Sequence, residues 1–224
     1  MFAKLSHYLL EPMNALTHLA GAVAAAMGTA VLLYATRHDP PRMFSMLVYG
    51  FCLTLLFTAS TLLHGIKASE VNRMRLNRLD HVAIFLLIAG SYTPIAFNLF
   101  SPPWRWRVLT AVWSIVAIGS AFKLFRQQIH GFLNASIYVI LGWGGVLPLM
   151  LSANLLPLLP PSGWLLLLLG GVIYTGGFVI YYRQSPDPWP GILGHHEIWH
   201  LFVLAGSLAH YLFILWYVVP YPRS

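Results

Sequence analysis

The chain of 224 residues is 58% hydrophobic and only 8% charged, whereas soluble domains carry roughly 25% charged residues. So few charges cannot cover a water-facing surface, which excludes an ordinary soluble enzyme and indicates an outer surface that faces lipid. The formal net charge of +7 does not indicate nucleic-acid binding, because the basic residues lie in short stretches between apolar runs and form no basic stripe.

About seven hydrophobic stretches are each near the roughly 20 residues that a bilayer core requires. The stretches between them contain proline, glycine and charged residues, which are typical of turns. The sequence therefore predicts an all-α polytopic membrane protein, a seven-transmembrane helix bundle that forms a single domain over residues 1–224. We place the spans at approximately 14–36, 44–66, 81–100, 108–125, 132–153, 163–182 and 196–218.

The distribution of lysine and arginine predicts the orientation of the bundle, because these residues favour the cytoplasmic side of a membrane. An odd number of spans places the termini on opposite sides. With the N-terminus inside, the inner segments hold eight lysines and arginines and the outer segments hold five. We therefore expect a cytoplasmic N-terminus and a C-terminus on the outside.

Polar side chains occur at one end of several predicted spans, where ionisable groups are costly and usually mark a function. Ser60 and His64 on the second span are four residues apart and share one helix face, as do His196 and His200 on the seventh. Asp80 lies at the start of the third span. Because successive spans alternate in direction, all of these groups are expected at one membrane face, which is cytoplasmic in the predicted orientation.

The three histidines predict a zinc site in which His64, His196 and His200 are neutral ligands and the fourth position is open. Three protein ligands plus a water are the pattern of catalytic zinc, whereas structural zinc sites are closed by four protein ligands. The alternative for any one histidine in a span is a hydrogen bond between helices. No other cofactor is expected.

Asp80 and Ser60 are the candidate catalytic residues beside this zinc. Asp80 would hold the metal-bound water and act as general base, and Ser60 would orient a ligand or donate to an oxyanion. The alternative for Asp80 is an ion pair with Arg78 or another loop arginine. The alternative for Ser60 is a hydrogen bond to the backbone of its own helix.

The start of the first span carries Glu11, Asn14 and His18 on nearly one face. These residues are candidates to contact and orient the metal-binding histidines without binding the metal themselves. For His18 the alternative is helix packing. The letters H-E-x-x-H open the seventh span and would make Glu197 the base of a zincin. A zincin needs a soluble cleft and a third ligand further along the chain, so we expect Glu197 to be a solvated acid. His210 lies about three turns deeper than the ligands and is not expected to bind metal.

The chain contains four ordered motifs: Glu11-x-x-Asn14-x-x-Thr17-His18-x-x-Gly21, Ser60-x-x-x-His64, Leu79-Asp80-His81 followed by Ala89-Gly90-Ser91-Tyr92-Thr93-Pro94, and His196-x-x-x-His200-x-Phe202-x-x-Ala205-Gly206 followed by His210. With these motifs the chain resembles the bacterial hemolysin III family, within the progestin and adipoQ receptor (PAQR) family. The resemblance implies a seven-helix bundle with zinc on the three histidines. It also implies that Asp80 contacts the zinc-bound water and that Ser60 supports it.

The broader superfamily includes alkaline ceramidases, so the resemblance implies lipid amide hydrolysis. We expect a zinc-dependent hydrolase of a lipid amide or ester in the bacterial inner membrane, linked to membrane lipid and fluidity homeostasis. Its expected partners are membrane lipids, including a lipid substrate. The rivals are a non-enzymatic membrane sensor or regulator with a structural zinc, and a hemolysin-type cytolytic protein.

Overall fold

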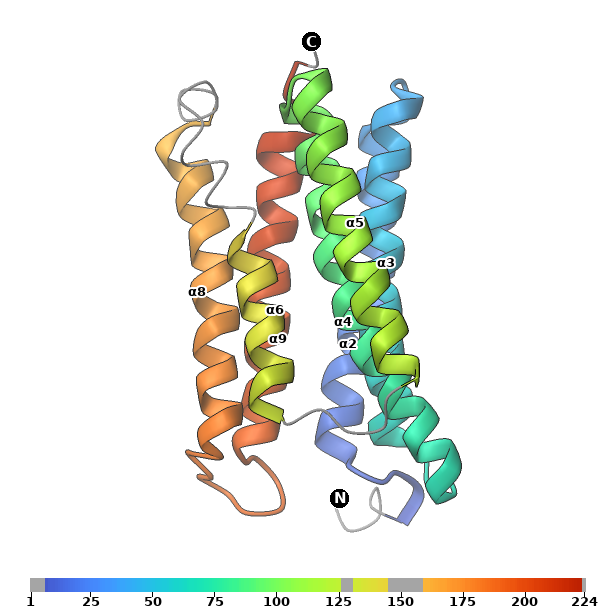
Figure 1. The fold of residues 1–224 in the computed structure, drawn as a ribbon. Coiled ribbons are helices and arrows are strands. Elements are labelled where there is room, and N and C mark those ends of the chain that lie inside the picture. The colour runs from blue at the N-terminus through green and yellow to red at the C-terminus, as the bar shows by residue number, and fades with distance from the viewer. Residues whose placement is uncertain (1–6, 126–130, 145–158, 223–224) are drawn as a thin grey trace.

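The computed structural model describes residues 7–125, 131–144 and 159–222, and these residues form long helices and no β-strand. Figure 1 shows the helices side by side along one common direction. The helices are α2 (Pro12–Ala35), α3 (Pro40–Gly65), α4 (Glu70–Leu99), α5 (Pro102–Phe125), α6 (Gly131–Gly144), α8 (Pro161–Arg183) and α9 (His195–Phe213), which continues as the π-helix η2 (Ile214–Val218).

Six of these helices are long and apolar enough to cross a membrane, namely α2, α3, α4, α5, α8 and α9 together with η2. The predicted all-α membrane bundle is therefore confirmed. The predicted span at 132–153 coincides with α6 over its first part, and its remaining residues, 145–153, lie outside the described part of the chain.

Proline determines where four of the helices begin, at Pro12, Pro40, Pro102 and Pro161. The first residue of a helix has no partner for its N–H, so a proline there loses nothing and its fixed φ already suits the helix. Hydropathy placed the spans a few residues later, because it detects only the apolar part of a helix. The difference is largest in α4, whose polar first turns begin at Glu70 instead of near residue 81.

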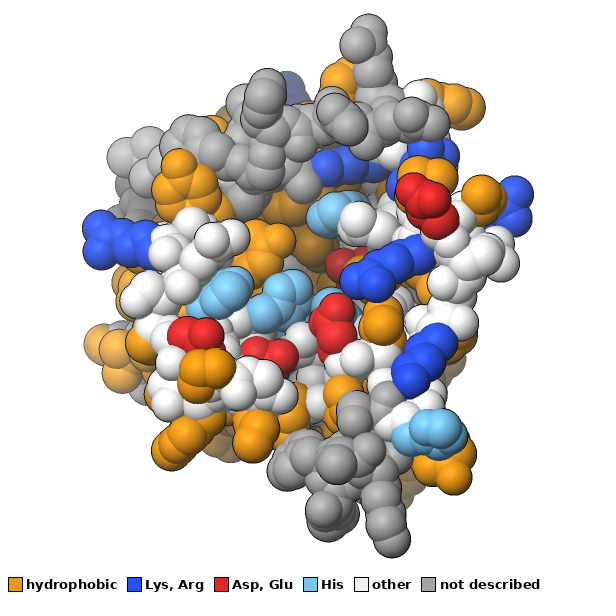
Figure 2. All heavy atoms as spheres, turned by 90° about the horizontal axis from the view of Figure 1, so that it is seen from below, with side chains coloured by type: hydrophobic (Ala, Val, Ile, Leu, Met, Phe, Trp, Pro, Cys, Tyr) orange, Lys and Arg blue, Asp and Glu red, His pale blue; other side chains and the backbone are white. Residues whose placement is uncertain are grey.

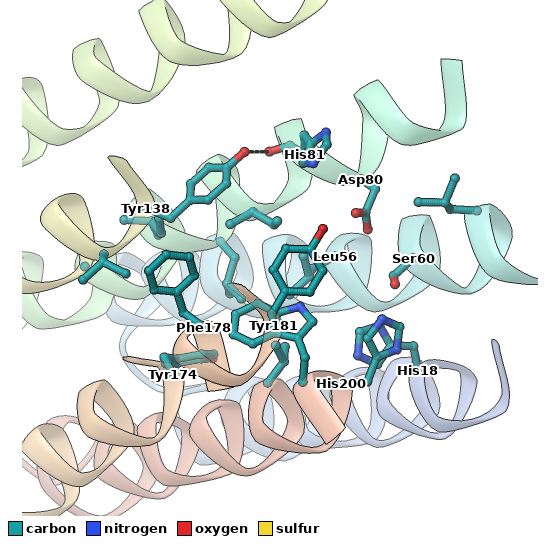
Figure 3. Close-up of a pocket in the computed structure, with 18 of the residues that line it drawn as sticks. His18, Leu56, Ser60, Asp80, His81, Tyr138, Tyr174, Phe178, Tyr181 and His200 are labelled. Carbon is teal, nitrogen blue, oxygen red and sulfur yellow. Dashed lines mark hydrogen bonds between the residues drawn. The ribbon is translucent and has the colours of Figure 1, made fainter. Parts of the chain in front are cut away.

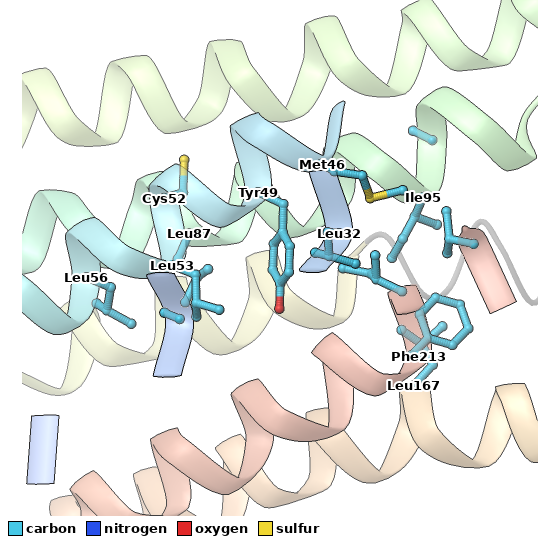
Figure 4. Close-up of a cluster of buried hydrophobic side chains, with 14 of the residues drawn as sticks. Leu32, Met46, Tyr49, Cys52, Leu53, Leu56, Leu87, Ile95, Leu167 and Phe213 are labelled. Atoms are coloured by element: carbon cyan, nitrogen blue, oxygen red, sulfur yellow. The ribbon is translucent and has the colours of Figure 1, made fainter. Parts of the chain in front are cut away.

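Helix α3 packs between α2 and α4, α5 packs on α4, and α8 packs on α9. Contact between α2 and α9 brings the first and last of the described helices together. The core contains Leu32, Met46 and Phe213, each fully buried (Figure 4). Large apolar side chains such as Met27 and Phe51 are instead exposed on the outside of the bundle. A helix bundle in a bilayer requires apolar side chains both in its core and on its outer surface.

Candidate metal centre

Three histidines from two helices face one another at one end of the bundle. His64 lies in the last turn of α3, and His196 and His200 occupy the first two turns of α9. Ligand atoms from the three imidazoles all lie within 4.8 Å of one another, close enough to bind one metal ion. Figure 2 shows pale blue histidine side chains gathered in a hollow at this end, with acidic side chains beside them.

The Glu11 carboxylate accepts a hydrogen bond from one of these imidazoles. Its carboxylate Oε2 lies 2.5 Å from Nδ1 of His64. Since a carboxylate only accepts, Nδ1 carries the proton and Nε2 is left as the ligand nitrogen. The hydrogen bond from His64 lowers the pKa of Glu11 to about 2, so the carboxylate is ionised at neutral pH. A carboxylate, a histidine and a metal in this order form a common arrangement that fixes the tautomer of the ligand.

The position of Glu11 follows from its place directly before α2. Its backbone N–H donates to the carbonyl of His64 at 2.8 Å, so the start of α2 is attached to the end of α3. Asn14, one turn later, donates from Nδ2 to the same carboxylate oxygen at 3.0 Å. Arg73 of α4 approaches the other oxygen at 3.5 Å. Residues from three helices therefore orient the carboxylate that holds His64.

His18 stacks on His200, with ring centroids 3.7 Å apart and an interplanar angle of 12°. The His18 ring also packs in a T-shaped arrangement with Phe57, with ring centroids 5.1 Å apart. Within the described part of the chain, neither nitrogen of His18 nor Nδ1 of His200 has a hydrogen-bond partner. His18 therefore supports His200 by ring packing, whereas Glu11 supports His64 by a hydrogen bond.

Asp80 and Ser60 face each other beside the histidines. Figure 3 shows the Asp80 carboxylate on α4 and the Ser60 hydroxyl on α3 pointing toward one another. Among the described residues Asp80 makes no ion pair with an arginine, and Arg78 donates instead to the carbonyl of Leu124 at 3.2 Å. The Asp80 carboxylate therefore lies beside Ser60 and the histidines, and its catalytic role stays a prediction.

Two further residues near the site have positions that the sequence did not reveal. The ring of Tyr181, in the last turns of α8, packs in a T-shaped arrangement with His196, with ring centroids 5.4 Å apart. A tyrosine at the end of an apolar span is equally typical of a membrane interface, so no sequence signal distinguished it. Glu197 accepts a hydrogen bond from the N–H of Gly194 at 2.9 Å. It caps the start of α9, a use of its carboxylate that the sequence analysis did not consider.

A cavity of about 720 Å³ opens at this end and extends between the helices. Its wall includes all three histidines together with Ser60 and Asp80. Farther along, the wall is apolar and includes Leu56, Leu87, Ile88 and Phe178 (Figure 3). This volume lies within the range of pockets that hold small molecules, roughly 300–1,000 Å³. A polar site therefore continues into space suited to a hydrocarbon chain.

The donor set suits a zinc-like ion. Three neutral imidazoles are the ligands of one common catalytic zinc type, and an ionised carboxylate behind one of them offsets part of the metal charge. Imidazole also binds copper, nickel and iron, so the three histidines could hold a metal ion but do not by themselves select zinc.

Comparison with known proteins gives matches over nearly the whole chain. Residues 6–211 match a protein family described as "Haemolysin-III related". The chain is 36% identical over 214 residues to "Hemolysin-3" of Bacillus cereus, covering 94% of this chain and 92% of that protein. It is 33% identical over 214 residues to the "Hemolysin-3 homolog" of Bacillus subtilis (strain 168), covering 95% and 96%. It is 26% identical over 215 residues to the human "Monocyte to macrophage differentiation factor", covering 94% and 85%.

Proposed function

Because this chain belongs to the hemolysin III family, within the PAQR family, we propose that it is a zinc-dependent membrane hydrolase. Its substrate would be a lipid amide or ester, and its role would be in membrane lipid and fluidity homeostasis. One observation carries the proposal: a single cavity joins three clustered histidines, Asp80 and Ser60 to a long apolar interior. A zinc that only pins helices together needs no such space, so the cavity favours an enzyme over a sensor with a structural zinc.

The metal would be held by His64, His196 and His200. When bound there, zinc lowers the pKa of a water toward about 7 and polarises a carbonyl oxygen. Glu11 keeps the Nδ1 proton on His64, so that Nε2 stays available to the ion. His18 limits the rotation of His200 by stacking on its ring.

Asp80 would act as the general base and then as the general acid. Its carboxylate accepts a proton from the attacking water, and the oxygen of that water forms the new bond to the substrate carbonyl carbon. The C–N bond of an amide, or the C–O bond of an ester, then breaks. Asp80 returns the proton to the leaving amine or alcohol, and a carboxylic acid is the second product. Ser60 orients the Asp80 carboxylate that it faces.

The apolar part of the cavity would hold the acyl chain of the substrate. With the scissile carbonyl near the histidines, a hydrocarbon chain has room among Leu56, Leu87 and Phe178. Burial of a chain in preformed apolar space supplies binding free energy that positions the reacting carbonyl.

Cleavage of defined lipids tests the proposal. Purified protein in liposomes is incubated with a ceramide-like N-acyl lipid and with an ester lipid, and the released fatty acid is measured by mass spectrometry. We expect release by the wild type and a loss of about 100-fold or more for Asp80→Asn, since general acid–base catalysis contributes 10²–10⁴-fold. Asp187→Asn, an exposed aspartate in the loop before α9, is the matched control and should retain activity. Metal-replete protein that cleaves neither lipid would contradict the proposal and favour the sensor.

We further propose the bacterial inner membrane as the location, with the metal centre at the cytoplasmic leaflet. The N-terminal ends of α2, α4 and α9 lie at the end of the bundle that holds this centre, and the residues Lys67 to Arg78 add basic groups there. A cysteine introduced as His38→Cys, in the loop after α2, should react with an impermeant maleimide from outside the cell. The native Cys52 is buried and contributes little background. Labelling of this cysteine only after the membrane is opened would show that the protein has the opposite orientation.

A further inference from the structure

The cavity narrows at its inner end, away from the histidine centre. A small pocket of about 40 Å³ follows the main cavity there, with walls from α4, α6, α8, α9 and η2. Four residues line both spaces, namely Ser91, Tyr92, Gly142 and His210. These four residues form a neck, and a chain that passes from the main cavity into the small pocket passes each of them.

Three apolar side chains form the floor of the small pocket. Ile95 of α4, Leu167 of α8 and Ile214 of η2 line this pocket but not the main cavity. Their exposed fractions are 8%, 4% and 0%, and all three belong to the buried core. Figure 4 shows Ile95 and Leu167 among the core side chains. The inner end of the cavity is therefore bounded by close-packed apolar groups, which resist an occupant that is too large.

The polar groups beside the neck bond mainly to the protein itself. Ser91 donates to a carbonyl of its own helix at 2.8 Å, and the Tyr92 hydroxyl donates to two carbonyls of α6 at 2.9 and 3.0 Å. Nε2 of His210 lies 3.2 Å from the carbonyl of Leu167. Tyr49 of α3 also lines the main cavity, but its hydroxyl is sealed from it and has no hydrogen-bond partner among the described residues. A hydrocarbon chain that passes these side chains breaks none of these hydrogen bonds.

Gly142 keeps the neck open on the side of α6. The α6 residues on the cavity wall share one helix face, and they are Tyr138, Val139, Gly142 and Trp143. A Cβ on Gly142 would meet no atom of the described residues within 4 Å. A larger side chain at this position would therefore extend into the space of the neck. Gly144 is equally open, but it lies on the opposite side of α6 and lines neither space.

We infer that the inner end of the cavity limits the length of the acyl chain, and that Gly142 lets the chain reach the floor. The ligand is a lipid whose saturated chain runs from the histidine centre through the neck to Ile95, Leu167 and Ile214. The inference rests on the proposed function for one point only, that the carbonyl end of the lipid lies at the histidine centre.

The length of the last helix sets the number of carbon atoms that fit. His210 lies ten residues after His200, and Ile214 lies fourteen residues after it. At the helical rise these separations are about 15 Å and about 21 Å. An extended chain advances roughly 3.3–3.6 Å for every three bonds. A chain that stops at the neck therefore has roughly twelve carbon atoms, and one that reaches the floor has roughly sixteen to eighteen.

Competition among fatty acids tests this limit without any need for turnover. Purified full-length protein in detergent is mixed with equal amounts of saturated fatty acids of ten to twenty-four carbon atoms. The protein is separated by gel filtration, and the bound acids are identified by mass spectrometry. We expect acids of sixteen and eighteen carbons to be enriched about tenfold over those of twenty-two and more, because a longer chain must distort the core or withdraw its head from the histidines.

The variant Gly142→Leu fills the neck and should move the preferred length from sixteen to eighteen carbons to about twelve. Gly144→Leu is the matched control and should keep the profile of the wild type. Leucine suits a helix interior better than glycine, so neither change weakens α6 itself. A Gly142→Leu profile equal to that of the wild type would overturn the role of Gly142.

The wild type alone decides the length limit, whether or not any variant folds. Equal enrichment of all chain lengths, or a preference for about twelve carbons, would overturn the inference. Cleavage of a lipid by protein without a length preference would leave the hydrolase intact and remove the limit. A preference for sixteen to eighteen carbons in protein that cleaves no lipid would retain the limit and remove the hydrolase.

Discussion

The two ends of the cavity both contain histidine, and the two settings differ in a way that explains what each can bind. At the outer end, three imidazoles cluster within 4.8 Å and an ionised carboxylate holds one of them. At the inner end, His210 is a single imidazole beside the main-chain carbonyl of Leu167 and the ring of Tyr174. The first setting concentrates lone pairs and negative charge for a cation. The second is neutral and suits an uncharged group. The neighbours of a histidine, more than its presence in a span, decide its use.

The largest expected difference between the two ends is in metal binding. His200→Ala removes a ligand and should weaken the metal more than the roughly 100-fold typical of losing a supporting group. His210→Ala should retain the metal content of the wild type. Elemental analysis of the folded fraction after gel filtration measures both. If His210→Ala loses as much metal as His200→Ala, the distinction between the ends is wrong.

Replacement of Glu11, whose carboxylate accepts from His64, should have the next largest effect on metal binding. Glu11→Gln keeps the shape but removes the charge that fixes the tautomer of His64, and we expect a metal Kd about 10–100-fold higher. Competition with a chelator of known affinity gives the Kd. Glu70→Gln, at an exposed glutamate in the first turn of α4, is the control and should leave the Kd unchanged.

A change in packing at the inner end of the cavity should lower the stability of the protein. Gly170→Ala places a methyl group within 2.4 Å of the His210 ring, and overpacking of this kind should lower the free energy of unfolding by about 1–3 kcal/mol. Gly142→Ala of α6 meets no atom within 4 Å and serves as the comparison. Thermal unfolding in detergent distinguishes the two, and equal midpoints would show that His210 is not held as tightly as the contact suggests.

The smallest effect on metal binding is expected from a change at Arg73. Its Nη2 lies 3.5 Å from Oε1 of Glu11, and its side chain is 54% exposed. Exposed ion pairs contribute less than about 1 kcal/mol because water and salt screen them. Arg73→Gln should therefore change the metal Kd by less than about fivefold. A change as large as that of Glu11→Gln would mean that Arg73, rather than Glu11 alone, determines the charge behind His64.

Much of this arrangement could be predicted from sequence because it rests on local spacing and on alternation of helix direction. The four-residue spacing of His196 and His200 places both on one face, and alternation brings His64 to the same end. Hydropathy located the spans, although it placed the start of α4 near residue 81 and missed the polar turns from Glu70.

The remaining features depend on contacts between distant helices, for which the sequence carries no signal. The motif suggested that Glu11 supports the site, but only the packing of α2 on α3 shows that its partner is His64. Tyr49 looks like an ordinary core tyrosine in an apolar span. Its unsatisfied hydroxyl is a property of what surrounds it, and so is the close approach of His210 to Gly170.

Anomalous diffraction from crystals of the protein at the zinc absorption edge tests the central claim most directly. A metal centre built by His64, His196 and His200 predicts one strong anomalous peak between these three imidazoles, at the outer end of the cavity. A peak beside His210, a peak elsewhere on the surface, or no peak in zinc-supplemented protein would contradict it.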